Sequence, residues 1–129
     1  MGLDAYIYKT KKEFSSGEEL GGLVRSNNEK NIDNDFLEDV RYFRKFHYLN
    51  MWVCDNAVPN DIYEFNCEYI ELTEEHFDKL FKDMFLDFVE ETESYDALTE
   101  RQFQNTLQLI VECKEILKQG YSIYYWAWW

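Results

Sequence analysis

The chain has 129 residues, of which 46% are apolar and 19% aromatic, and its formal net charge at pH 7 is −13. This composition excludes a disordered chain, and the length suits one domain, so residues 1–129 are predicted to fold as a single unit. The negative charge disfavours direct contact with nucleic acid or a membrane and favours a protein partner with a basic surface. Because no apolar run approaches roughly 18 residues, we expect a soluble, intracellular protein.

The cysteines, Cys54, Cys67 and Cys113, are odd in number and form no Cys-x-x-Cys pair. Each lies in an apolar stretch, so we expect three reduced thiols in the core. His47 and His76 lack the spacing to a cysteine that a zinc site requires. The sequence predicts no metal and no cofactor, and because it offers no catalytic motif, a binding function is favoured over an enzymatic one.

The first half of the chain gives a strand and a helix. Alternating apolar residues predict a short strand over residues 3–9. Residues 10–34 contain several glycines and a cluster of asparagines, which predicts a loop-rich segment with at most one short turn. Asp35 is placed to cap a central helix over about residues 36–54, where apolar side chains recur at steps of three and four.

The second half predicts a strand over residues 66–72 and two more helices. Thr73 caps a helix whose apolar side chains, from Phe77 to Val89, show the strongest helical period in the chain. Thr99 and Gln102 have the spacing of a capping box for the next helix, and Gly120 is suited to end it. An aromatic strand over residues 121–129 follows. The predicted fold is α+β, a three-stranded, mainly antiparallel sheet with about three helices, in the order strand–helix–strand–helix–helix–strand.

Short motifs carry a family resemblance. The chain starts MGLDAYIY, contains VRYFRK at residues 40–45 with Trp52 further on, and ends KEILKQGYSIYYWAWW. These stretches resemble an uncharacterised group of small phage and prophage proteins with an MGLD-x-Y start, a Val-Gly-Tyr-Trp-Arg-Lys segment and a tail ending in Trp. Arg41 and Phe43 depart from that segment. The resemblance implies a phage setting and the cytoplasm of a bacterial host, and it implies no activity.

Acidic residues are concentrated between residues 61 and 100, where fourteen Asp and Glu stand against two Lys. Carboxylates one helical turn apart lie about 6 Å apart along the axis, and DNA carries a charge about every 1.7 Å. A row of them could imitate a phosphate backbone and inhibit a host or defence factor that binds nucleic acid. A solvated face and a cation site are the alternatives. The predicted partner-binding acids are Glu74, Glu75, Asp78, Asp83, Asp87, Glu90 and Glu91.

A second candidate site is the basic and aromatic segment around residues 41–52. An anionic small molecule or substrate could bind between cations there and stack on an aromatic ring. The alternative is that these cations pair with the surplus acids. The residues of this predicted ligand site are Arg41, Arg44, His47, Tyr48 and Trp52.

The aromatic tail is the third candidate. Both faces of the predicted terminal strand are apolar, so it is either central in the sheet or covered by a partner, with Trp126 and Trp128 as contact residues. A homodimer or larger homo-oligomer that pairs this strand across a two-fold axis is a further possibility.

Overall fold

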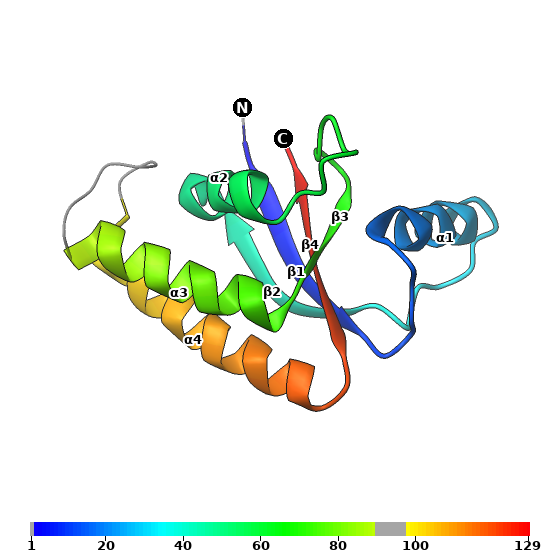
Figure 1. The fold of residues 1–129 in the computed structure, drawn as a ribbon. Helices are drawn as coiled ribbons and strands as arrows, with labels where there is room; N and C mark the ends of the chain where they lie inside the picture. The colour runs from blue at the N-terminus through cyan, green and yellow to red at the C-terminus, as the bar shows by residue number, and fades with distance from the viewer. Residues whose placement is uncertain (1, 90–97) are drawn as a thin grey trace.

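The computed structural model describes residues 2–89 and 98–129 and shows an α+β protein with four strands and four helices in the described residues. Figure 1 shows their arrangement. In chain order the elements are β1 (Asp4–Thr10), α1 (Gly17–Glu29), β2 (Glu38–Arg44), α2 (His47–Asn56), β3 (Tyr69–Leu72), α3 (Glu74–Val89), α4 (Glu100–Lys118) and β4 (Ser122–Trp128).

The sheet has the strand order β2-β1-β4-β3, and every neighbouring pair is antiparallel. The first and last strands are therefore the two central ones, and the two chain ends lie side by side in Figure 1. Side chains alternate between the two faces, as β-strand geometry requires. Ala5 and Ile7 of β1 lie on the same face as Ile123 and Tyr125 of β4, and all of them are buried.

Three helices cover that face and enclose the hydrophobic core, to which α2, α3 and α4 all contribute. Helices α3 and α4 run antiparallel, joined near one end by an ion pair of Asp78 with Lys114 and near the other by stacked rings of Phe88 and Phe103, 4.3 Å apart. Helix α1 lies on the opposite side of the sheet (Figure 1). Within residues 2–89 and 98–129, the sheet thus has three helices on one face and one helix on the other.

The predicted three-stranded sheet with three helices is wrong, although the α+β class is confirmed. Residues 36–54, expected as one helix, form strand β2 and helix α2. The chain turns between them at Lys45, whose φ is +57° and whose N–H donates to the carbonyl oxygen of Leu3. The residues of β2 include Val40, Tyr42 and Phe43, which favour a strand once β1 is available for pairing.

The second error concerns residues 10–34, which were predicted as a loop-rich segment because of their glycines and asparagines but contain helix α1. Ser16 caps this helix and accepts a hydrogen bond from the N–H of Glu19. One of the glycines is required by packing. A Cβ on Gly17 would lie 1.8 Å from the carbonyl oxygen of Tyr69, whereas one on Gly21 would make an ordinary contact, 3.6 Å from the Tyr69 ring. Gly17 therefore lets the start of the helix approach β3 closely.

Local signals gave the later elements correctly. Thr99 and Gln102 form the expected capping box, and Gly120 follows α4 with a φ of +92°. The terminal strand is central, between β1 and β3. Over the described part of the chain, none of the helices combines the length and apolar character needed to cross a bilayer.

Candidate functional site

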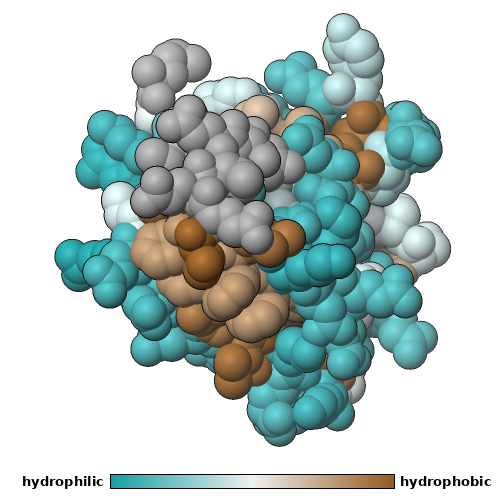
Figure 2. Space-filling model, turned by 60° about the vertical axis from the view of Figure 1, so that its left-hand side comes forward, coloured by the Kyte–Doolittle hydropathy of each residue, from teal (hydrophilic) through white to brown (hydrophobic). Residues whose placement is uncertain are grey.

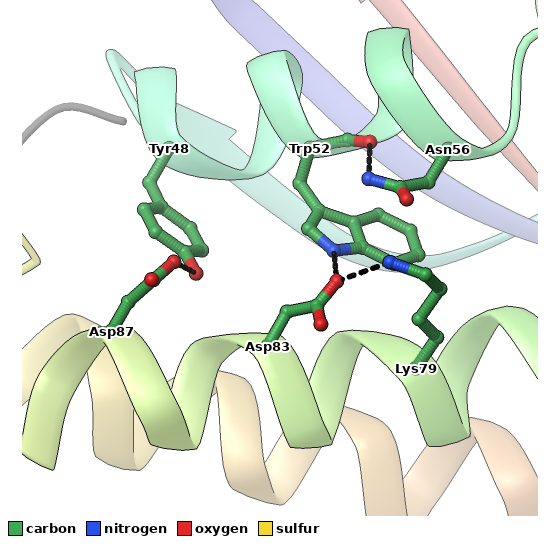
Figure 3. Close-up of polar contacts among 6 residues, drawn as sticks. All are labelled: Tyr48, Trp52, Asn56, Lys79, Asp83 and Asp87. Atoms are coloured by element: carbon green, nitrogen blue, oxygen red, sulfur yellow. Dashed lines mark hydrogen bonds and ion pairs between the residues drawn. The ribbon is translucent and has the colours of Figure 1, made fainter. Parts of the chain in front are cut away.

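The acidic side chains of α3 divide into separate groups. Asp83 and Asp87 point toward α2 (Figure 3). The Asp83 carboxylate accepts a hydrogen bond from Nε1 of Trp52 at 3.0 Å and pairs with Lys79 at 2.6 Å, and Asp87 accepts from the Tyr48 hydroxyl at 2.6 Å. These two carboxylates hold α2 against α3.

The other predicted acids are placed differently. Asp78 pairs with Lys114 of α4, and Glu74 and Glu75 are exposed in the first turn of α3. Glu90 and Glu91 lie outside the described residues. Within the described part of α3, a partner therefore meets the carboxylates near the start of the helix, whereas Asp83 and Asp87 are hydrogen-bonded to α2.

The predicted ligand site at residues 41–52 is not gathered into one place. Arg41 forms an ion pair with Glu112 of α4 at 3.2 Å, and Arg44 is exposed opposite Asp4 of β1. Tyr48 and Trp52 are buried beneath α3, whereas His47 is exposed at the start of α2. A cavity of about 180 Å³ contains only Arg44 of the five and is lined by Tyr42, Phe43, Arg44, Phe46, Gln102, Asn105 and Thr106.

The thiols differ from the prediction, because Cys54 and Cys67 are exposed and only Cys113 is buried. Burial, followed by the charge of Glu112, raises the pKa of Cys113 to about 12. Burial and an adjacent acid raise the pKa of the other two thiols as well. Among the described residues, no three His, Cys, Asp or Glu side chains gather closely enough to hold a metal ion.

The surface that the sequence did not reveal is an apolar strip along α3 and α4. Figure 2 shows it as a continuous brown area among hydrophilic residues. On α3 the strip contains two stacked phenylalanine rings 6.2 Å apart, and the Phe85 side chain is 45% exposed. On α4 its most exposed member is Val111, at 71%. We define the apolar strip as Phe81, Phe85, Val89, Leu107 and Val111.

The pairing of α3 with α4 explains why these five residues meet. The Asp78–Lys114 and Phe88–Phe103 contacts fix the antiparallel alignment of the helices. Between these contacts, Phe81 comes level with Val111 and Phe85 with Leu107. The sequence did carry a signal for an exposed apolar surface, because the apolar residues of α3 span more than one face of the helix. In the structure, only Phe77, Leu80 and Met84 of this helix are buried.

Charged groups border the strip, and a hollow lies beside it. Glu74 and Glu75 lie at the start of α3, and Glu115 is exposed on α4 near Lys114. The hollow has a volume of about 340 Å³ and is lined by Leu107, Gln108, Val111 and Glu112. A half-exposed pair of aromatic rings, a neighbouring hollow and a border of charge are typical of a protein-binding surface.

Trp126 and Trp128, the predicted contact residues of the tail, lie on the other face of the sheet. They alternate with Ile123, Tyr125 and Ala127, which point into the core. Because β4 is hydrogen-bonded to β1 on one side and to β3 on the other, its side chains rather than its backbone are available to a partner.

The fold and these surfaces describe an α+β protein with an antiparallel sheet, a paired-helix layer and an exposed apolar strip. Comparison with models of protein families, with curated proteins and with solved structures finds no match to this chain.

Proposed function

We propose that this chain is a protein-binding protein that docks through its apolar strip onto a partner with a positively charged surface. The observation that carries the proposal is the pair of exposed, stacked rings of Phe81 and Phe85 on a rigid helix pair. In the monomer, roughly half the surface of each ring remains in contact with water. Burying a Phe side chain fully stabilises a complex by about 1.5–3 kcal/mol, so each ring can still contribute about half of that.

The rigidity of the strip also supports a docking role. Its residues lie on two helices whose alignment is fixed by an ion pair and a ring stack, and α3 is tied to α2 by Asp83 and Asp87. A surface that is ordered before association loses little conformational entropy on binding. Aromatic residues on such surfaces supply much of the binding free energy.

Charge supports a basic partner over a second copy of the chain. The net charge of −13 repels another copy and attracts a positively charged surface over a Debye length of about 8–10 Å. In the narrower form of the proposal, the partner is a nucleic-acid-binding factor that this chain inhibits in a phage setting. The net charge and the exposed Glu74 and Glu75 support that form, whereas Asp83 and Asp87 do not contribute to it.

The test compares two adjacent apolar residues of α3. Phe85→Asp places a charge in the strip, whereas Leu86→Asp adds the same charge one residue further around the helix, at a side chain that is also exposed. The tagged wild type and both variants are used to capture proteins from a bacterial lysate at increasing salt concentration. We expect the wild type and Leu86→Asp to retain the same proteins at low salt and Phe85→Asp to lose them. Equal retention by both variants would contradict docking through the strip.

A further inference from the structure

The second face of the sheet carries an aromatic surface, and among the described elements one helix, α1, covers part of it. Helix α1 packs over the end of this face near Tyr69 and Tyr124, where Phe14 meets the Tyr124 ring edge-on. At the other end, near the chain termini, Tyr42 is 51% exposed and Trp128 is 56% exposed. We define the aromatic platform as Tyr6, Tyr42, Trp126 and Trp128.

Strand register places the four rings of the platform in adjacent rows. Tyr6 lies between Tyr42 of β2 and Trp126 of β4, with ring centroids 5.0 and 5.9 Å away. In the next row, Asp4 lies between Arg44 and Trp128. The rings thus form a semi-continuous surface, with one carboxylate at its edge.

Asp4 is bound into this surface, because its carboxylate accepts a hydrogen bond from the Tyr42 hydroxyl. This hydrogen bond, more than any other contact, raises the pKa of Tyr42 above its ordinary value. A phenol that donates to a carboxylate has an electron-rich ring. Electron-rich faces beside a carboxylate attract cations, and a planar guanidinium can both stack on the rings and bind the carboxylate.

We propose that the aromatic platform binds the guanidinium group of an arginine in a basic peptide segment. The chain already uses this chemistry internally, since the Lys9 and Lys11 ammonium groups lie 4.7 and 4.9 Å from the centroid of the Tyr121 ring. The net charge of −13 favours a cationic ligand and opposes the phosphates of a single-stranded nucleic acid, which could otherwise stack its bases here. This proposal is independent of the strip on α3 and α4.

Substitution of Arg44 offers a second test of the proposal. Its guanidinium is exposed beside Asp4 and makes no ion pair with another described residue. Its positive charge repels an incoming arginine near Asp4. Replacing Arg44 by glutamine should therefore strengthen binding, whereas replacing Asp4 by asparagine should weaken it.

The experiment measures fluorescence anisotropy of labelled hexa-arginine, hexa-lysine and a short oligothymidylate with the full chain. Tyr42→Leu and Trp128→Leu should each weaken hexa-arginine binding by about 2- to 30-fold, the range of one cation–π contact. Tyr63→Leu is the matched control, because Tyr63 is a fully exposed aromatic residue of the loop before β3. It should leave the affinity unchanged, as should Phe85→Asp to within about twofold, so the two proposals can fail separately. Circular dichroism confirms that each variant is folded.

Three results would overturn the proposal. The first is equal affinity of hexa-arginine for the wild type and for both platform variants, which would place the peptide elsewhere on the acidic surface. The second is equal affinity for hexa-lysine and hexa-arginine, which would exclude guanidinium stacking. The third is binding of oligothymidylate, weakened by Tyr42→Leu and Trp128→Leu, without binding of hexa-arginine.

Discussion

Replacing Asp83 by alanine is expected to destabilise the protein much more than replacing Asp78, although both are aspartates of α3. The Asp83 side chain is 27% exposed and accepts a hydrogen bond from Trp52, a residue that is 1% exposed. The Asp78 side chain is 57% exposed and pairs with Lys114 at the surface. The two substitutions change helix propensity equally, so that contribution cancels between them.

The magnitudes follow from what each substitution leaves behind. Alanine at position 83 leaves the buried Trp52 N–H without its acceptor, which costs about 1–3 kcal/mol. Loss of the ion pair with the half-exposed Lys79 adds at most about 1 kcal/mol to the cost of Asp83→Ala. Loss of the ion pair with Lys114 is the cost of Asp78→Ala and is likewise about 0–1 kcal/mol. The expected difference between the variants is therefore about 2 kcal/mol. For a domain of this size it corresponds to a difference in Tm of about 6–10 °C.

The measurement is urea unfolding followed by circular dichroism for both variants, with Trp52→Phe to complete a double-mutant cycle. Phenylalanine keeps most of the ring volume and removes the donor, so Asp83→Ala should cost about 1 kcal/mol less in that background. If Asp83→Ala and Asp78→Ala destabilise the protein to within about 0.5 kcal/mol of each other, Asp83 is a solvated carboxylate and the reasoning fails.

Three further predictions concern α1, the thiols and His76. Gly17→Ala should cost more than about 2 kcal/mol in urea unfolding, because its Cβ would overlap the Tyr69 carbonyl oxygen, whereas Gly22→Ala, with open space around it, should stabilise α1 by about 0.5–1 kcal/mol. A thiol reagent at pH 8 should modify Cys54 and Cys67 in the native protein and Cys113 only after unfolding, since Cys113 is buried with a pKa of about 12; native labelling of all three would contradict this. Burial, opposed by Glu75 and Glu71, lowers the pKa of His76, whose Nδ1 accepts from the Thr73 N–H. The contribution of the neutral His76 side chain to the free energy of unfolding is therefore complete above the unfolded pKa of about 6.5. It is lost as the pH falls through the lower pKa of the folded protein. The free energy of unfolding should then fall less between pH 7.5 and 5 for His76→Gln than for the wild type, and an equal fall would refute this role.

The sequence predicted the elements whose signals lie within one or two helical turns. The capping box at Thr99, the helix end at Gly120 and the period of α3 are local features, and the structure contains all of them. The strand at residues 38–44 was missed because its conformation depends on pairing with β1, whose partner residues, from Lys9↔Glu38 to Asp4↔Arg44, lie 29 to 40 positions away in the sequence. The spacing of the apolar residues in this segment is compatible with a helix, but pairing with β1 determines that the segment forms a strand.

The candidate surfaces show the same division between local and distant causes. The polar face of α3 was visible in the sequence, but the donors that bind Asp83 and Asp87 belong to Trp52 and Tyr48 of α2. The apolar strip was also hidden, because Phe81 and Phe85 fit the buried stripe as well as Phe77 does. Which of them is covered depends on where α4 lies.

The exposed acids and the apolar strip are expected to affect different steps of binding, association and dissociation. Exposed carboxylates such as Glu75 act at a distance, so reversing them should slow association and reduce its dependence on salt. The rings of the strip act only after contact, so Phe85→Asp should mainly speed dissociation. Surface plasmon resonance on a captured partner can measure the two rates for Glu75→Lys and Phe85→Asp. If both variants changed only the association rate, charge would account for the binding and the strip would have no part in it.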